Sequence, residues 1–489
     1  MDQKHVFPDW WEVDPGYGVD LKGYNPKDGS PYGVTIKAHK PMTVETEAII
    51  RPDNPWEQPR VGAYASVVKV GDTYHAWYEV VAIDPACFSL CYATSRDGVH
   101  WEKPNLGLHE YQGSKENNIL RVNGGHGYYT DEGEVVIYDE NAPVEERFKM
   151  VFTRVVYDYE PGVRRIMTGV ETHGAISADG IHWTELGKFF EGGDTQASLL
   201  YDKKRKKYVI LTKSRDPEHL ARRTMIYSES DDFRSFTEPR ILLNGDPNDP
   251  PDMDYYQLAG HEWKGADNAY VLFPTPFHRT SDFVEVILAT SRDLNTIHKP
   301  MGNLPIISRE NGLPGCVYSC VGMVDEGDGK WIHYYCPMPG GHNAEGMVGE
   351  IMQKEKARYP GICRFIYRED GYTSLHAESH GGIITVLLQF GKRLMINADI
   401  QSYGRIEIAV TDEAGKVLEG FDFADCRLEK VNHISYEVKW AKALDCLDLN
   451  TKYRLKMKLF KCDLYSYTFL DCPDRSDHPE DNKKAFYVI

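Results

Sequence analysis

A seven-residue phrase recurs four times in this chain. Ser95–Trp101 returns as Ser177–Trp183, and more divergent copies follow at Ser230–Phe236 and Ser291–Ile297. Each copy has Ser-x-Asp, three further residues and a large apolar side chain, and strand-like sequence precedes it. A turn that is repeated together with its strands is typical of radially repeated blades, as in a β-propeller. In such a fold one strand end from every blade faces a common polar funnel, where ligands bind.

The chain between residues 46 and 368 is almost entirely strand-like, with short apolar runs between Gly, Asp and Asn turns. We therefore predict an all-β fold in which residues 46–368 form a five-bladed β-propeller, and we expect this propeller to be the catalytic domain. The inner strands of the five blades are traced at 64–70, 133–138, 197–201, 255–260 and 318–324.

Different sequence flanks this region on both sides. Residues 1–45 are rich in Gly, Pro and Asp and lack periodicity, so we expect an irregular N-terminal lead-in that wraps the propeller. From residue 369 onward alternating apolar and polar runs resume, and they predict a C-terminal β-sandwich over residues 369–489.

Charge and aromatic content limit the partners. The chain has 74 acidic and 56 basic residues and a net charge of −18, which repels phosphate backbones and argues against nucleic acid as a partner. Aromatic residues make up 12%, with 31 Tyr and 9 Trp, a content that suits sheet packing and also stacking on sugar rings. We expect a small-molecule carbohydrate as the substrate, and self-association into a homo-oligomer stays open.

Cysteine spacing and the N-terminal residues bear on the compartment. The 10 cysteines show no CxxC pair with a His partner, so they are expected to be small buried side chains rather than zinc ligands. The first residues lack a basic stretch followed by an apolar run, and no stretch is long enough to span a bilayer. We therefore expect a cytoplasmic protein without membrane contact, unless a leader has been removed.

Several motifs resemble those of one enzyme group. Residues Tyr92–Leu108, Asn117–Ile119, Gly193–Gln196 and Asp370–Leu375 resemble bacterial invertase-like glycoside hydrolases. On these motifs the chain is similar to the five-bladed β-propeller glycoside hydrolase superfamily of invertases, levansucrases, arabinanases and β-xylosidases. The resemblance implies a propeller followed by a β-sandwich, and cleavage of glycosidic bonds. One position departs from it, because the first inner strand opens with Arg60–Ser66, where those relatives carry an Asp.

Hydrolysis of a glycosidic bond needs two carboxyl groups, one protonated and one ionised. In a propeller such groups come from the starts of inner strands or the ends of second strands. The candidate catalytic residues at these places are Asp194, Asp254, Glu57 and Glu79. Asp194 and Asp254 are the preferred pair, because each lies directly before an inner strand. Asp131, Glu132, Asp252 and Glu310 occupy similar places. The aspartates of the repeated turns are expected to hydrogen-bond their own turns instead.

Cationic and aromatic side chains near the same rim are candidates for substrate contacts. They are Trp56, Arg154, Lys213, Arg215, His278 and His342. Trp56 would offer a stacking platform, and several cations together would suit an anionic sugar such as a uronic acid. We expect no cofactor, although the acid-rich centre of a propeller could hold a structural calcium ion; no loop of the EF-hand type occurs.

These observations together predict a glycoside hydrolase that acts on an oligosaccharide or glycoside through paired carboxylates in the funnel. One alternative is a non-catalytic carbohydrate-binding protein on the same fold, which the missing Asp of the first inner strand favours. Another is a phosphorylase, sialidase or lyase acting on sugars. No P-loop, dinucleotide-binding glycine motif or Ser-His-Asp signature stands out.

Overall fold

The computed structural model describes residues 2–15, 30–83, 86–123, 129–158, 166–194, 196–216, 222–313, 315–343 and 361–473. Among them the helical elements are four short 3₁₀ turns, η2 (Pro55–Glu57), η3 (Val144–Glu146), η4 (Arg309–Asn311) and η5 (Leu444–Cys446). The all-β prediction is confirmed. No helix in the described part of the chain is long and apolar enough to cross a bilayer.

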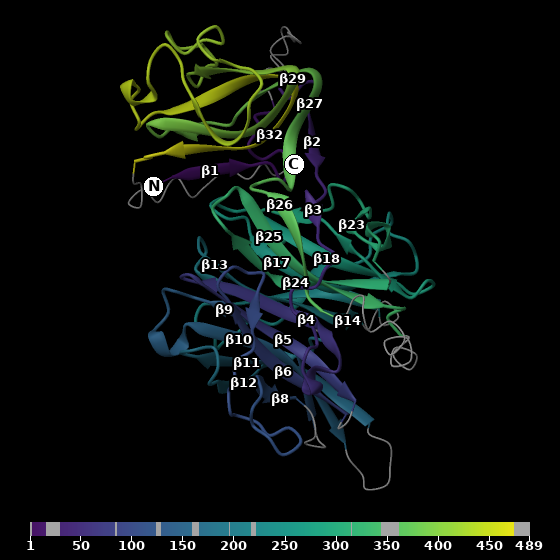
Figure 1. Ribbon diagram of the computed structural model, residues 1–489. Helices are drawn as coiled ribbons and strands as arrows, with labels where there is room; N and C mark the ends of the chain where they lie inside the picture. The colour runs from purple at the N-terminus through teal and green to yellow at the C-terminus, as the bar shows by residue number, and fades with distance from the viewer. Residues whose placement is uncertain are drawn as a thin grey trace. The chain divides into compact units, whose positions relative to one another are not determined.

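The chain divides into two compact units (Figure 1). The sandwich unit comprises Met1–His39, Lys264–Asp267 and Thr373–Ile489, and the propeller unit comprises Lys40–Trp263 and Asn268–Tyr372. The predicted domain boundaries at residues 46 and 369 stay a prediction.

The propeller unit is built from successive groups of antiparallel strands (Figure 1). The first group is β4 (Pro59–Val70), β5 (Thr73–Ile83), β6 (Ala86–Ser95), β7 (Trp101–Glu102) and β8 (Ile119–Val122). The second is β9 (Tyr129–Tyr138), β10 (Phe148–Asp158), β11 (Ile166–Ser177) and β12 (Thr184–Glu191). The third is β13 (Ser198–Asp202), β14 (Lys207–Asp216), β15 (Arg222–Ser230) and β16 (Arg240–Leu243).

Two further groups follow along the chain. The fourth is β17 (Met253–Glu262), β18 (Tyr270–His278), β19 (Phe283–Val284), β21 (Ala289–Ser291) and β22 (Ile297–His298), with a small sheet of β20 (Val286–Ile287) and β23 (Pro305–Ile307) beside it. The fifth is β24 (Gly315–Asp325), β25 (Lys330–Pro339), β26 (Cys363–Arg368) and β3 (Thr43–Val44).

The inner strands of these groups close into a ring. β4 contacts β9, β9 contacts β13, β13 contacts β17, β17 contacts β24, and β24 returns to β4. At the last junction Val321 of β24 pairs in parallel with Ser66 of β4. β3, which precedes the first group in the chain, pairs with β26 as the outer strand of the fifth group. The two ends of the propeller sequence therefore share one sheet, and the unit is a ring of five blades.

Buried polar side chains link the blades near the axis. The side-chain amide of Gln196 donates to the backbone oxygens of Ala65 (2.8 Å) and Glu134 (3.1 Å). The amide of Gln257 donates to the side-chain oxygen of Gln196 (3.2 Å) and to the backbone oxygen of Ser319 (2.6 Å). Because buried polar groups require partners, these bonds favour one arrangement of the five inner strands.

The repeated phrase forms the same hydrogen-bonded turn each time. In the second copy Ser177 Oγ accepts from the backbone N–H of Asp179 (3.2 Å) and Gly180 (2.9 Å). Asp179 Oδ1 accepts from the backbone N–H of Ile181 (2.9 Å) and His182 (2.8 Å). The aspartates of the other copies accept the equivalent backbone bonds. The expectation that these aspartates stabilise their own turns is confirmed.

The N-terminal segment differs from the irregular lead-in that the sequence predicts. In the sandwich unit β1 (Gln3–Val6) pairs with β32 (Lys452–Leu470), and β2 (Thr35–Ala38) pairs with β27 (Thr373–Ile384). With β3 in the propeller, the described residues of the segment contribute three short strands. Strands of two to four residues are too short to show a period of two, and their partners lie near the other end of the chain, so local sequence did not reveal them.

Two long strands lie in the middle of the sheet of the sandwich unit. β29 (Arg393–Thr411) pairs along β32, with a register shift between Ile400 and Arg405. The first half of β29 also pairs with β31 (Asn432–Val438) and the second half with β30 (Arg427–Leu428), while β28 (Leu388–Gln389) pairs with β32. Side chains of both halves of β29 belong to one hydrophobic cluster. A single eight-stranded sheet thus encloses the core of this unit.

Candidate functional site at the propeller axis

Each blade contributes one residue near the start of its inner strand to a connected set. The residues are Tyr64 on β4, Glu132 on β9, Asp194 just before β13, Tyr256 on β17 and Tyr318 on β24. The hydroxyls of Tyr64 and Tyr256 are 3.2 Å apart, and the rings of Tyr256 and Tyr318 meet edge to face at 5.8 Å. Burial raises the pKa of Tyr256, and the charges of Asp194 and Glu132 raise it further, so both acids lie near that ring.

Asp194 is paired with a buried lysine. Lys213, on β14, places Nζ 2.8 Å from Oδ2 of Asp194 and 3.8 Å from the ring centre of Tyr256. Burial lowers the pKa of Lys213 to about 8, although the charge of Asp194 raises it. The pair and the ring hold one another in place, because a desolvated ammonium gains from both a carboxylate and an aromatic face.

Asp254, the other predicted acid, lies beside two arginines. Nη1 of Arg223, on β15, is 3.4 Å from Oδ2 of Asp254, and Nε of Arg279 is 3.7 Å from the same oxygen. The Arg223 guanidinium carbon is 5.5 Å from the ring centre of Tyr256. Within the described residues, the buried Oδ1 of Asp254 and Nε of Arg223 have no hydrogen-bond partner. The predicted pair Asp194 and Asp254 is therefore brought together around Tyr256.

Glu79 is a buried carboxyl group at the junction of the first and second blades. It lies on β5, and the backbone N–H of Gly133 donates to its Oε2 at 3.3 Å. Burial, followed by the charges of Glu134 and Glu132, raises the pKa of Glu79 well above its ordinary value. The charge of Glu79 acts in turn on the hydroxyl of Tyr64. Glu79 is thus a carboxyl group whose surroundings favour the protonated form.

His342 completes the set from the fifth blade. Its Nδ1 is 2.7 Å from the hydroxyl of Tyr318, and its ring meets those of Tyr256 (4.3 Å) and Phe277 (4.9 Å) edge to face. Burial, and then the charges of Lys213 and Arg223, lower the pKa of His342 to about 4. At neutral pH this imidazole is uncharged.

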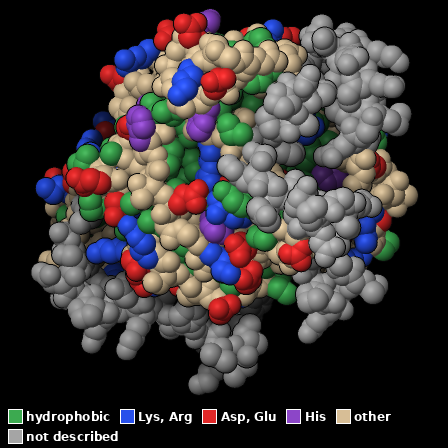
Figure 2. Space-filling model, turned by 90° about the horizontal axis from the view of Figure 1, so that it is seen from below, with side chains coloured by type: hydrophobic (Ala, Val, Ile, Leu, Met, Phe, Trp, Pro, Cys, Tyr) green, Lys and Arg blue, Asp and Glu red, His purple; other side chains and the backbone are tan. Residues whose placement is uncertain are grey.

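We call this set the axial network. It consists of Tyr64, Glu79, Glu132, Asp194, Lys213, Arg223, Asp254, Tyr256, Tyr318 and His342. Figure 2 shows one face of the molecule on which acidic, basic and histidine side chains lie among hydrophobic ones around a hollow.

Glu57 and Trp56, both predicted as site residues, make contacts outside the axial network. Glu57, on η2, is fully buried; its Oε1 accepts from the Tyr78 hydroxyl at 2.7 Å, and its Oε2 is 2.8 Å from Nζ of Lys103. The Trp56 indole N–H donates to the side-chain oxygen of Asn118 at 2.7 Å. These bonds fasten η2 to the first blade and occupy both carboxylate oxygens of Glu57.

Three other predicted contacts do not join the network through the described residues. Arg154 forms a two-point ion pair with Asp131, at 2.7 and 2.8 Å, within the second blade. His278 is the last residue of β18 and is half-buried. Arg215 belongs to β14 by its backbone, but its side chain lies outside the described residues.

Sequence reasoning missed several members of the network. Tyr64 and Tyr318 lie within strands whose aromatic residues also suit sheet packing. Arg223 lies on the third strand of its blade, away from the strand starts and ends at which site residues were expected. Glu132 was noticed as an acid before an inner strand but was not preferred. A search for polar or aromatic side chains at the first inner positions of all five blades would have found Tyr64, Glu132 and Tyr318.

Metal ligation has no ready candidate here. Among the described residues no group of three or more His, Cys, Asp and Glu side chains is arranged to hold a metal ion. All nine described cysteines are free, and eight of them are buried, as expected for small apolar side chains. The calcium ion at the propeller centre stays a prediction.

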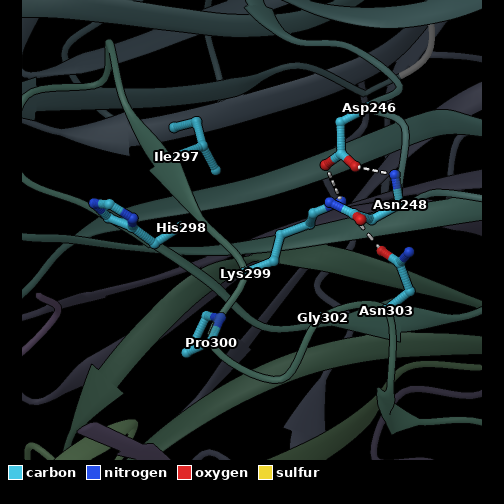
Figure 3. Close-up of a pocket in the computed structure, with 8 residues that line it drawn as sticks. All are labelled: Asp246, Asn248, Ile297, His298, Lys299, Pro300, Gly302 and Asn303. Atoms are coloured by element: carbon cyan, nitrogen blue, oxygen red, sulfur yellow. Dashed lines mark hydrogen bonds and ion pairs between the residues drawn. The ribbon is translucent and has the colours of Figure 1, made fainter.

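A separate pocket of about 560 Å³ shares no residue with the axial network (Figure 3). It is lined by Asp246, Asn248, Ile297, His298, Lys299, Pro300, Gly302 and Asn303. Nζ of Lys299 is 2.9 Å from Asp246 and 3.3 Å from Asn303, and it also bonds Asp249 and the Tyr255 hydroxyl. The charged groups of this pocket thus satisfy one another, and it is the weaker candidate for a functional site.

Comparisons with known proteins give structural likeness only. No protein-family profile matches the chain, and no curated protein matches it. Among solved structures, an N-acetylgalactosamine deacetylase from F. plautii in complex with blood group B trisaccharide is 15% identical, with 69% of this chain and 94% of that chain covered and a TM-score of 0.43. A glycosyl hydrolase from Bacteroides ovatus is 14% identical (68% and 94% covered, TM-score 0.40).

A thermostable family-43 glycoside hydrolase is also similar, with 14% identity, 65% of this chain and 95% of that chain covered, and a TM-score of 0.42. Because each of these TM-scores is below 0.5, the functional proposal depends on the axial network and not on the likeness.

Proposed function

We propose that the protein is a glycoside hydrolase that cleaves glycosidic bonds of an oligosaccharide or glycoside at the axial network. Such hydrolysis requires a carboxyl group that donates a proton to the leaving oxygen and a carboxylate that acts as base or nucleophile. The observation that supports this assignment is that Glu79 lies near Tyr64 and Asp194 near Tyr256, while the hydroxyls of these two tyrosines are 3.2 Å apart. Glu79 is held in surroundings that favour its proton, whereas Asp194 is paired with Lys213.

In the proposed reaction Glu79 gives its proton to the oxygen of the leaving sugar as the bond from that oxygen to the anomeric carbon breaks. Asp194 either attacks the anomeric carbon or removes a proton from the attacking water. Lys213 keeps Asp194 in position. The unpartnered Oδ1 of Asp254 would accept a hydrogen bond from a sugar hydroxyl, and the ring of Tyr256 would provide an apolar face.

A second candidate function is carbohydrate binding without catalysis. Glu79 is 3% exposed, and the first inner strand offers Arg60 and Tyr64 but no carboxylate between Arg60 and Ser66. A substrate would therefore reach the proton of Glu79 only after a local rearrangement. A protein that binds a glycan and releases no product would fit this second function.

The test is a screen of oligosaccharides and aryl glycosides with the wild-type chain and the variants Glu79→Gln and Asp194→Asn. We expect each variant to lower kcat/KM by about 10²-fold or more, as is usual when a general acid or base is removed. The matched control is Glu185→Gln, an acid on β12 that pairs with Arg154 outside the network. Unchanged turnover in both network variants would reject the assignment, and binding without product would select the second function.

A further inference from the structure

The two cations of the axial network, Lys213 and Arg223, each lie beside a carboxylate. Lys213 is paired with Asp194, and Arg223 and Arg279 both lie beside Asp254. Arg154 is likewise occupied by Asp131. Each of these cations thus has a carboxylate beside it, although Arg223 and Arg279 share one. An arginine without any ion pair is therefore the better place to look for an anion site.

Arg60 is such a cation. It lies at the start of β4, opposite Val81 of β5, and is half-buried. Within the residues that the structure describes, no hydrogen bond or ion pair joins its guanidinium to a partner. A half-buried arginine without a carboxylate is unusual, because a desolvated charge is costly unless it is compensated.

The groups around Arg60 belong to the first and fifth blades. Its charge acts on Glu79, Tyr318 and Cys336, in each case against the dominant effect of burial, which raises the pKa of the group. Burial thus favours the uncharged form of all three groups. In that form they do not neutralise Arg60, and Glu79 and Tyr318 carry O–H groups that donate hydrogen bonds.

Resting on the proposed function, we propose that Arg60 forms an anion subsite of the axial network and that the substrate or co-substrate brings a negatively charged oxyanion to it. A guanidinium binds a carboxylate or a phosphate through two parallel N–H bonds. The protonated carboxyl of Glu79 and the hydroxyl of Tyr318 would supply further donors. The same chemistry would recognise the carboxylate of an acidic sugar or an inorganic phosphate ion.

The test measures binding rather than turnover. The full-length wild-type chain is titrated calorimetrically with glucuronate, with inorganic phosphate and with glucose as the neutral counterpart. We expect at least one anion to bind about tenfold or more tightly than glucose, in line with a charge-assisted two-point contact. Arg60→Gln should abolish this preference, and Arg60→Lys should retain part of it.

The control is Arg96→Gln, which removes an arginine from an exposed repeated turn where it contacts Thr73. This variant should bind all three ligands as the wild type does. Thermal unfolding of each variant shows whether it is folded, and Arg60→Lys keeps the test decisive if Arg60→Gln is not. Equal binding of anions by the wild type and Arg60→Gln, or no preference of the wild type for either anion over glucose, would overturn the subsite.

The titrations with glucuronate and with phosphate distinguish the two possible sources of the oxyanion. Preference for glucuronate assigns an acidic sugar as the substrate. Preference for phosphate, with turnover that requires phosphate, assigns phosphate as co-substrate: its oxygen bonds the anomeric carbon, the glycosidic C–O bond breaks, and the leaving oxygen takes the proton of Glu79. Loss of anion preference in Arg60→Gln supports the subsite even if Glu79→Gln and Asp194→Asn leave hydrolysis unchanged, so the two proposals fail separately.

Discussion

Lys213 and Asp194 form an ion pair in which the lysine side chain is 2% exposed and the carboxylate is 31% exposed. The cation is thus shielded from solvent by its surroundings, while the carboxylate keeps an accessible edge. An ion pair of this kind is screened less by salt than a surface pair and orients the carboxylate toward whatever enters from the open side.

This pair predicts a pH limit for hydrolysis. Because burial lowers the pKa of Lys213 to about 8, the lysine loses its charge as pH rises through that value, and Asp194 loses its partner. We expect kcat/KM to fall above pH 8. In Lys213→Arg the guanidinium stays charged, so the fall should move upward by about one pH unit or more.

The measurement is a pH profile of kcat/KM for the wild type, Lys213→Arg and the control Lys188→Arg, which alters a lysine on β12. A fall at the same pH in Lys213→Arg and the wild type would show that another group sets the limit.

Glu57 should matter for stability and not for turnover. Its carboxylate is buried and pairs with Lys103 while it accepts from Tyr78. Glu57→Gln keeps the shape but leaves Lys103 with only the more exposed carboxylate of Asp53 as a counter-charge, so we expect a loss of about 1–3 kcal/mol in the free energy of unfolding. Urea unfolding measures the loss, and kcat/KM should stay within about twofold.

Glu47→Gln, at an exposed surface pair with Arg51, provides the comparison and should change the unfolding free energy little. Normal stability of Glu57→Gln together with lost activity would restore Glu57 as a catalytic candidate.

Two buried histidines predict acid sensitivity of the propeller. The rings of His261 and His333 are 5.4 Å apart, and Nε2 of His333 is 2.7 Å from the Tyr372 hydroxyl. Burial lowers the pKa of His261 from 6.5 to about 4, and burial also lowers that of His333 well below 6.5. Below pH 6.5 the unfolded chain binds protons that the folded chain does not, so stability should fall between pH 6.5 and pH 4.

Urea unfolding between pH 7 and pH 4 measures this loss of unfolding free energy. Its slope against pH corresponds to the uptake of at most about one proton by each histidine on unfolding. His261→Gln should reduce the slope against pH, whereas His100→Gln, at an exposed turn histidine, should not. An unchanged slope in His261→Gln would show that other groups cause the acid sensitivity.

Gly180 of the repeated turn and Gly107, which lies outside it, have similar backbones, but we expect substitution by alanine to cost more stability at Gly180. Gly180 has φ of 75° and Gly107 has φ of 70°. A Cβ at Gly180 would lie 2.7 Å from a ring carbon of Trp77, whereas a Cβ at Gly107 would meet nothing within 4 Å. Gly107→Ala should therefore cost about 1–2 kcal/mol for the left-handed backbone alone, and Gly180→Ala about 1–3 kcal/mol more for the clash.

Urea unfolding of the two variants checks this difference, and equal losses would show that the packing against Trp77 relaxes freely. In the third and fourth copies of the repeated turn, the position of Gly180 is occupied by Phe233 (φ 57°) and Leu294 (φ 56°), both fully buried. In those copies the burial of an apolar side chain offsets the backbone strain.

Much of the fold could be predicted because its signals are local. The Ser-x-Asp turn is held by bonds between residues two or three positions apart, so its copies mark the blades directly. Asp194, Asp254, Lys213 and His342 were found because strand starts and ends are visible in the alternation of the sequence. Glu57 occupied the same kind of place, but its partner Lys103 lies far along the chain, and local sequence could not show that both its oxygens were taken.

The sequence by itself therefore determined the strands, the turns and the positions at which polar side chains meet the axis, because these depend on periodicity and short-range hydrogen bonds. The closed ring decided what those side chains are chemically. It placed Glu79 beside Glu134, Lys213 against the ring of Tyr256, and Arg60 where no ion pair with a described residue forms. The affinity of a group for a proton or an ion depends on its burial and on nearby charges, and both exist only once blades distant in the chain have come together.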